Sequence, residues 1–254
     1  MAGIDVVGDL LARDRRSRDP ALVTPDGRER TAHDLITNGY KAANVLRYLG
    51  AREGSTVAVD PTPGLHATLA FLGAARLGAA VRFDPDAGVA AGDRVVVVPV
   101  ADGSALDPRP GTNIAAFGGP PERPETTHWE QELWSENPAT PPSTVSPSDP
   151  VVRGEGGTVS HGRLVDAAEA AATEHGIDPG TRVVVRTTLA DSRTVAAGVV
   201  APLARGGVVV LTDAAGETDP ESTSLGDLAV VDGPDAEPPE PARVDVASLP
   251  DLTR

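Results

Sequence analysis

The sequence predicts an α/β layered fold with mostly parallel sheets. Short, nearly continuous apolar runs such as residues 94–98 are typical of strands buried on both faces. Longer stretches with apolar residues at helical spacing, such as residues 65–77, are typical of helices packed on a sheet. The two kinds of segment alternate along the chain, which favours parallel strands joined by crossover helices.

The first 117 residues supply the first set of elements. Residues 4–16 carry apolar side chains at helical spacing, and residues 21–30 are typical of a hairpin around Pro25-Asp26-Gly27. Thr31 is the predicted N-cap of a helix that ends before Gly50, with Asp34 as the reciprocal partner of the cap. The further elements expected are a helix over 65–77 and strands over 56–59, 79–83, 94–98 and 112–117.

A proline-rich segment, residues 118–149, interrupts this alternation. We expect an irregular surface excursion with one helical turn over 128–133. Its two tryptophans, Trp129 and Trp134, have two interpretations: both rings anchor the excursion to the domain, which the sequence favours, or the pair forms a partner site.

The alternation resumes in the second half. Helices are expected over 160–175 and 191–204, and strands over 181–187, 207–211 and 227–231. From residue 233 onward the chain is rich in proline and acidic residues, which predicts a disordered acidic tail. The predicted organisation is therefore a first α/β subdomain (1–117), the excursion (118–149), a second α/β subdomain (150–232) and the tail (233–254).

The composition narrows the possible functions. There are 37 acidic residues against 22 basic ones, a net charge of −15, and the only lysine is Lys41. An acidic surface of this kind indicates adaptation to high salt, and it makes nucleic acid an improbable partner. The absence of cysteine excludes disulfides and thiol chemistry. No apolar stretch is long enough for a membrane span and no secretory signal is visible, so a cytoplasmic location is expected.

Several segments, in order, resemble the N-terminal part of the adenylate-forming superfamily, which contains the acyl-CoA synthetases, the luciferases and nonribosomal adenylation domains. The segments are Pro20-Ala-Leu-Val23, Asp26-Gly-Arg28, Ala42-Ala-Asn-Val-Leu-Arg-Tyr-Leu-Gly50, Gly54-Ser-Thr-Val-Ala-Val59, Ala70-Phe-Leu-Gly-Ala-Ala-Arg-Leu-Gly-Ala79, Val159-Ser-His-Gly-Arg-Leu164, Gly176-Ile-Asp-Pro-Gly-Thr-Arg-Val183 and Ala201-Pro-Leu-Ala-Arg-Gly-Gly-Val-Val-Val-Leu211. The resemblance implies the layered sheets of the N-terminal subdomains of AMP-binding synthetases.

The chain differs from the family in the segments that carry the family's catalytic and nucleotide-binding motifs. A Ser/Thr/Gly-rich loop that ends in Pro-Lys-Gly wraps the triphosphate in the family, whereas this chain has only Arg153-Gly-Glu-Gly-Gly-Thr158 at that point. The family's later adenine, magnesium and ribose motifs and its small C-terminal domain, which carries a catalytic lysine, have no counterpart. Lys41 lies in the Ala42-Ala-Asn44 helix and is not expected to replace that lysine.

A remnant phosphate loop is the candidate ligand site. Its residues are those that match the family segment: Arg153, Gly154, Gly156, Gly157, Thr158, Ser160 and His161. Ser160 is the predicted helix cap, and His161 is interpreted as an exposed first-turn residue rather than as a catalytic base. His33, His66, His128 and His175 have no metal-ligand spacing, so no metal and no catalytic residue are expected.

Three hypotheses follow. In the first, the chain is a non-catalytic relative (a pseudoenzyme) of the AMP-dependent synthetases with a binding or regulatory role. In the second, it is one chain of a split acyl-CoA synthetase, completed by a protein partner at an exposed apolar sheet edge near residues 211–231. In the third, the remnant loop weakly binds ATP, AMP or CoA without chemistry.

Overall fold

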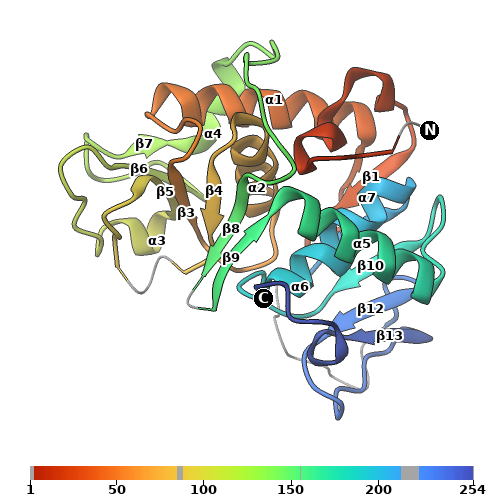
Figure 1. The fold of residues 1–254 in the computed structure, drawn as a ribbon. Coiled ribbons are helices and arrows are strands. Elements are labelled where there is room, and N and C mark those ends of the chain that lie inside the picture. The colour runs from red at the N-terminus through yellow and green to blue at the C-terminus, as the bar shows by residue number, and fades with distance from the viewer. Residues whose placement is uncertain (1–2, 85–87, 155, 213–222, 254) are drawn as a thin grey trace.

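The structure, a computed structural model, describes residues 3–84, 88–154, 156–212 and 223–253. Two sheets lie on either side of a pair of helices, as Figure 1 shows. The predicted α/β layered fold with mostly parallel sheets is therefore confirmed. Among the described helices, none is long and apolar enough to cross a membrane.

The larger sheet has seven strands in the order β7-β6-β5-β3-β4-β8-β9. All neighbours run parallel except β8 and β9, which form an antiparallel hairpin. Valines at its centre are fully buried because helices or loops cover both faces. The strands are β3 (Thr56–Val59), β4 (Ala80–Arg82), β5 (Asp93–Pro99), β6 (Asn113–Phe117), β7 (Thr127–His128), β8 (Pro150–Gly154) and β9 (Gly157–Ser160).

The smaller sheet has six strands in the order β13-β12-β10-β11-β1-β2. The predicted hairpin of β1 and β2 is antiparallel and turns at Gly27, whose φ of 79° favours glycine, while the other neighbours run parallel. The strands are β1 (Pro20–Val23), β2 (Glu29–Thr31), β10 (Arg182–Val185), β11 (Val208–Leu211), β12 (Leu228–Val231) and β13 (Ala242–Asp245).

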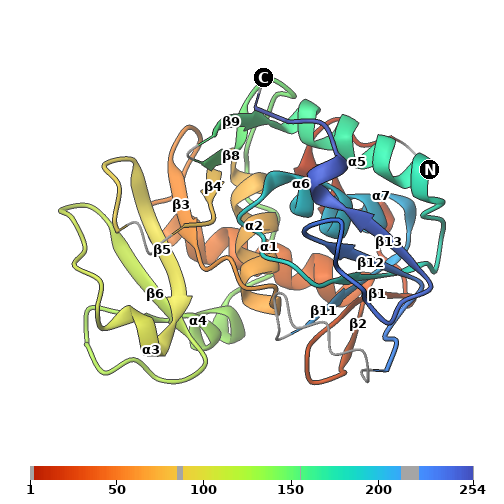
Figure 2. The same ribbon diagram turned by 90° about the horizontal axis from the view of Figure 1, so that it is seen from below.

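Two long helices form the layer between the sheets. α1 (Ala32–Tyr48) contacts β1 and β2, α2 (Leu65–Leu77) contacts β3 and β4, and the two helices pack on each other (Figures 1 and 2). The predicted capping box is present, because Thr31 Oγ1 accepts a hydrogen bond from the Asp34 N–H at 3.1 Å. At Gly73 the helices approach so closely that a Cβ would lie 2.8 Å from the Ala43 nitrogen.

The remaining helices cover the outer faces and edges. α5 packs on one continuous helical segment made of α6, a π-helical turn over Val195–Val200 and α7. The bounds are α3 (Val100–Gly103), α4 (Trp129–Ser135), α5 (His161–His175), α6 (Ser192–Thr194) and α7 (Ala201–Arg205).

The N-terminal helix predicted over 4–16 is wrong. The structure has two 3₁₀ segments there, Val7–Leu11 and Arg13–Arg15, separated by Ala12 in an extended conformation. Gly8 lies against α2, where an added Cβ would be 3.4 Å from the Arg76 Cα. The short 3₁₀ segment fits this close packing and still buries its apolar residues.

The disordered tail predicted over 233–254 is also wrong for the residues that the structure describes. β13 pairs in parallel with β12 and buries Val244, and a 3₁₀ turn follows at Val246–Ser248. Upstream of β13, Glu240 is buried against Arg186 of the segment after β10. The acidic, proline-rich composition predicted disorder, but this segment is ordered through contacts with residues that are distant in the sequence.

The two sheets also cut across the division of the chain at residues 117 and 150. β1 and β2 belong to the same sheet as β10 to β13, whereas β8 and β9 belong to the sheet of β3 to β7. In the described part of residues 211–231 the expected apolar edge is not exposed, because β11 lies between β10 and β1, and β13 covers β12. Residues 213–222 of that stretch lie outside the described residues. This removes the strand-pairing argument for a completing partner.

Only one of the two tryptophans anchors the proline-rich segment. Trp129 is fully buried and anchors the excursion, whereas Trp134 is 88% exposed. The two residues are five positions apart in α4, which places their side chains about 140° apart around the helix axis. Only Trp129 therefore fulfils the anchoring role.

Candidate functional site: the cleft beside the β8–β9 hairpin

The segment expected to be a remnant phosphate loop is a tight hairpin. Arg153 pairs with Thr158 and Gly154 pairs with Gly157, so only two positions connect the paired strands. Gly157 has a φ of 131°, which disfavours any residue with a Cβ. The paired backbone from Arg153 to Gly154 and from Gly157 to Thr158 continues the sheet.

A cleft of 910 Å³ lies beside this hairpin. It is bounded by the end of β4, by the hairpin, by the segment between β10 and α6, and by residues 251–253. Among the described residues, its charged lining consists of three aspartates and two arginines, which is formally one negative charge in excess: Asp84, Asp191, Asp251, Arg153 and Arg193.

Both cations of the lining already have polar partners. The Arg153 guanidinium donates to Thr56 Oγ1 of β3 at 3.0 Å. Arg193 contacts the Asp191 carboxylate with both Nε and Nη2, the Nη2 distance to Oδ2 being 2.6 Å. These hydrogen bonds raise the pKa of Arg193. An incoming anion would compete with the Asp191 carboxylate for Arg193.

Residues near the end of the described chain form one wall of the cleft. Leu252 is buried, and its carbonyl accepts a hydrogen bond from Arg163 Nη1 at 3.2 Å. Thr253 packs on the hairpin, where a Cβ on Gly157 would lie 3.2 Å from the Thr253 Cβ. The glycines of the hairpin thus accommodate the chain itself at this wall.

Ser160 and His161 act as structural residues. Ser160 caps α5 by accepting from the Arg163 N–H at 3.3 Å, as predicted. The exposed position predicted for His161 is wrong, because its ring is fully buried and Nδ1 accepts from the Val7 N–H at 3.2 Å. Burial lowers the pKa of His161 to about 4, which keeps the imidazole neutral.

The structure therefore brings together only part of the predicted set. Arg153, Gly154, Gly156 and Gly157 line the cleft, whereas Thr158, Ser160 and His161 do not. The Asp191–Arg193 pair and the wall at residues 251–253 were not predicted from the sequence. Asp191 had a visible signal as the first residue of the expected helix over 191–204, while the wall depends on a long-range contact with no local signature.

Comparison with known proteins supports the fold. An acyl-CoA synthetase from Brucella canis superposes with a TM-score of 0.74 at 19% identity, over 90% of this chain and 48% of the other. The anthranilate CoA ligase AuaEII in complex with anthranoyl-AMP gives a TM-score of 0.73 at 17% identity, over 89% and 49%. A benzoate CoA ligase from Burkholderia xenovorans LB400 gives 0.73 at 17%, over 89% and 50%.

No family model and no curated protein sequence matches the chain. The layered sheets nevertheless define a class, which is the α/β fold of the AMP-binding synthetases. Within it, the chain has the fold of their N-terminal subdomains and spans about half the length of the matched structures, as the 48–50% coverage shows.

Proposed function

We propose that this chain is a non-catalytic protein with the AMP-binding synthetase fold and a binding or regulatory role. The observation that carries the proposal is the pairing of Gly154 with Gly157. Anion loops present several free backbone N–H groups to a phosphate. In a hairpin this tight the backbone is committed to strand pairing, so the element that would hold a triphosphate is replaced by an edge of the sheet.

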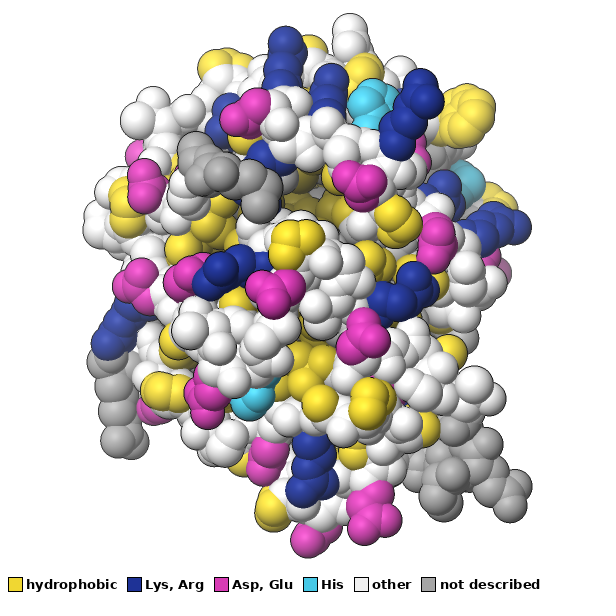
Figure 3. All heavy atoms as spheres, turned by 90° about the vertical axis from the view of Figure 1, so that its right-hand side faces the viewer, with side chains coloured by type: hydrophobic (Ala, Val, Ile, Leu, Met, Phe, Trp, Pro, Cys, Tyr) yellow, Lys and Arg dark blue, Asp and Glu magenta, His cyan; other side chains and the backbone are white. Residues whose placement is uncertain are grey.

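The charges of the cleft support the same conclusion. A phosphate oxygen about 4 Å from a carboxylate costs about 4 kcal/mol at an effective dielectric of 20. Asp191 lies in the lining and is already shared with Arg193, and the lining has more carboxylates than guanidinium groups. On the face drawn in Figure 3, acidic and basic side chains are interspersed, without a continuous basic surface among the residues described there. A polyanion gains little from this environment.

The decisive experiment is ATP–pyrophosphate exchange by the purified chain in molar salt with a panel of carboxylic acids. We expect no exchange above the protein-free blank, while an active acyl-CoA synthetase in the same assay exchanges readily. Exchange that scales with protein concentration and disappears in Arg153→Gln would overturn the proposal.

Thermal unfolding with AMP, ATP and CoA tests whether the cleft keeps nucleotide affinity without chemistry. A ligand at about 100 times its Kd stabilises the folded state by about 2.7 kcal/mol. We expect no such stabilisation from these three ligands. A saturable shift that is lost in Arg153→Gln would favour the weak nucleotide- or CoA-binding module instead.

The length of the match supports a second candidate, in which a separate chain completes a split synthetase. Such a partner would not dock by extending an apolar outer strand of the smaller sheet, because β2 has three residues, including Glu29 and Arg30, and β13 includes Arg243 and Asp245. Isolation from native lysate followed by ATP–pyrophosphate exchange on the isolated species tests this candidate. Recovery of monomer alone, without exchange, counts against it.

A further inference from the structure

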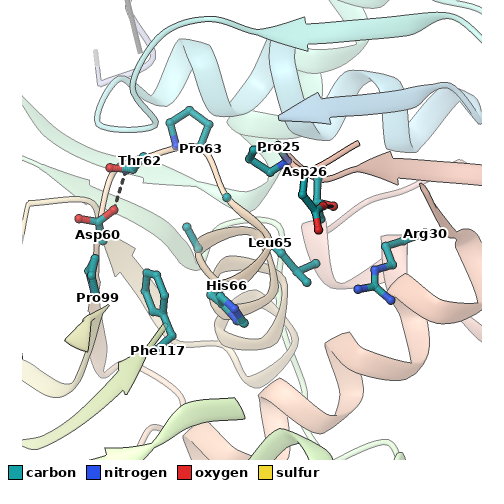
Figure 4. A pocket seen from close by; sticks show the side chains of 13 residues that line it. Pro25, Asp26, Arg30, Asp60, Thr62, Pro63, Leu65, His66, Pro99 and Phe117 are labelled. Atoms are coloured by element: carbon teal, nitrogen blue, oxygen red, sulfur yellow. Dashed lines mark hydrogen bonds between the residues drawn. The ribbon is translucent and has the colours of Figure 1, made fainter. Parts of the chain in front are cut away.

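A pocket of 480 Å³ opens at the carboxyl ends of β3, β5 and β6 and is closed by the turn between β1 and β2 (Figure 4). From β3 the chain passes through α2 to β4 on one side, whereas β5 lies on the other side of β3 and continues outward to β6. The strand order therefore reverses between β3 and β5, as at the ligand crevices of open α/β sheets. His66, whose ring stacks on Phe117 in this pocket, also lines a second cavity between α1, α2 and α4.

This second cavity opens beside an exposed tryptophan. Its volume is 360 Å³, and Trp134 of α4, which is 88% exposed, forms part of its lining. Asn38 and Lys41 of α1 add polar groups to the lining. The apolar part consists of four leucines from the three helices, which are Leu35, Leu65, Leu69 and Leu133. A recess of this kind suits a side chain with an apolar ring and a polar tip, as in tyrosine.

A second exposed aromatic side chain protrudes from the same face of α1. Tyr48 is 82% exposed. Asn38, Lys41 and Tyr48 are three and seven residues apart, so they lie along one face of the helix, with Lys41 and Tyr48 about 10 Å apart along its axis. The other five aromatic side chains of the chain are buried or packed on the core, and these are Tyr40, Phe71, Phe83, Phe117 and Trp129.

The segment that follows α4 connects the two exposed aromatic residues across the surface. Lys41 Nζ donates to the carbonyl of Trp134 at 3.4 Å, and Asn44 Nδ2 donates to the carbonyl of Ala139 at 2.7 Å. The segment therefore runs along α1 in the direction of Tyr48, which is one helical turn beyond Asn44. The cavity, Trp134, residues 134–139 and Tyr48 form one continuous surface, the α1–α4 face.

The two ends of this face carry opposite charges. Arg47, next to Tyr48, is exposed and has no ion-pair partner among the described residues. Glu136, two residues after Trp134, accepts from the Asn137 N–H at 2.9 Å and has no cation within ion-pair distance in the described part of the chain. A two-fold rotation about an axis near the middle of the face brings the basic end of one copy to the acidic end of another.

We propose that the α1–α4 face is an interface between two copies of this chain. Tyr48 of each copy enters the cavity of the other beside Trp134, and Arg47 of each copy pairs with Glu136 of the other. A two-fold contact needs a protrusion and a matching recess on the same surface, which Tyr48 and the cavity supply. The inference does not depend on the function proposed for the cleft beside the hairpin.

The area available is close to what such a dimer needs. Four exposed aromatic side chains, at about 150–250 Å² each, bury about 600–1,000 Å², and the smallest stable interfaces bury about 1,200 Å² in total. The neighbouring segment and the paired charges add to this area. The net charge of −15 opposes self-association, but molar salt shortens the screening length to about 3 Å. We therefore expect a dimer with a Kd in the micromolar range.

Sedimentation equilibrium in molar salt tests the association. The mass should rise with concentration from that of one chain to that of two. Trp134→Ala and Tyr48→Ala should each weaken the dimer about tenfold or more, because central aromatic residues carry most of the energy of an interface. Leu225→Ala is the matched control, since Leu225 precedes β12 and is 46% exposed. The mass of one chain at every concentration up to about 100 μM, or a dimer that neither aromatic variant weakens, overturns the proposal.

Exchanging the two charges between separate chains tests the two-fold arrangement. Arg47→Glu sets like charges against each other in both halves of the interface, and so does Glu136→Arg, so each variant alone should dimerise about tenfold more weakly than the parent. A mixture of the two variants restores both pairs and should dimerise as the parent does. The comparison is made at the lowest salt concentration at which circular dichroism shows all chains folded. Parental affinity in each variant alone, or a mixture that associates no better than its components, refutes the arrangement.

Discussion

Replacing Glu240 with Gln removes the charge that Arg186 contacts in the interior. Glu240 Oε2 and Oε1 accept from Arg186 Nε and Nη2, both at 2.7 Å, and the two side chains are 0% and 6% exposed. Glu240 Oε1 also accepts from the Leu225 N–H at 3.1 Å. The carboxylate therefore joins the segment before β13 to the end of β10 and to the segment before β12.

The expected loss is large because the remaining guanidinium stays buried. Removing one partner of a buried ion pair typically costs about 3–5 kcal/mol. In a protein of this size 1 kcal/mol corresponds to about 2–4 °C in Tm, so Glu240→Gln should lower Tm by about 6–20 °C. The double variant Arg186→Met/Glu240→Leu should recover most of this loss, because two apolar side chains leave no buried charge.

Urea unfolding in molar salt, followed by circular dichroism and tryptophan fluorescence, measures the effect. Glu169→Gln is the matched control, since Glu169 pairs with Arg205 at the surface, where its side chain is 58% exposed. Exposed pairs contribute about 0–1 kcal/mol, so the control should change stability little. A Glu240→Gln variant within about 0.5 kcal/mol of the parent would refute the argument that this pair anchors the C-terminal segment.

Two further variants probe buried contacts. The folded chain binds a proton at His161 only near pH 4, whereas the unfolded chain binds it near pH 6.5, so the free energy of unfolding should fall by about 3 kcal/mol as the pH drops from 6.5 to 4. His161→Asn keeps an acceptor for the Val7 N–H and should flatten this part of the stability–pH curve, which urea unfolding measures. An unchanged curve would contradict the role assigned to His161. Gly73→Ala places a Cβ 2.8 Å from the Ala43 nitrogen and should lower the free energy of unfolding by about 1–3 kcal/mol. Gly3→Ala is the control, because a Cβ there has nothing within 4 Å and should leave stability unchanged. Equal unfolding midpoints for the two variants would rule out the close approach of α1 and α2.

Local patterns were sufficient to predict most of the strands and helices. The apolar run at residues 94–98 lies within β5, and Thr31 with Asp34 marks the start of α1, because strand burial and helix capping depend on residues close in sequence. The burial of His161 is an example of what residues close in sequence do not predict. Its neighbour Ser160 caps α5 as expected, but its burial depends on Val7, 154 positions away, and no local pattern contains that contact.

The same distinction explains the C-terminal segment. β13 contributes a single fully buried side chain, Val244, so its composition resembles that of a solvated tail. Its order comes from strand pairing with β12 and from the Arg186–Glu240 contact across 54 positions. The pocket at the carboxyl ends of β3, β5 and β6 was likewise not predictable from local patterns, because only the folding of β2 beside the end of β3 brings its lining residues together.

The fold explains how a tight β8–β9 hairpin and the pocket at the carboxyl ends of β3, β5 and β6 coexist in one sheet. The central valines of β3, β4 and β5 are buried whatever the length of the β8–β9 connection, so a tight hairpin leaves the sheet intact. The segment between β3 and α2 walls both cavities, since Pro61 lines the cleft while Asp60 and Thr62 line the pocket. The strand-order reversal that creates the pocket is a property of the sheet, not of the loop. The non-catalytic role proposed for this chain is therefore compatible with an intact pocket at the carboxyl ends of β3, β5 and β6.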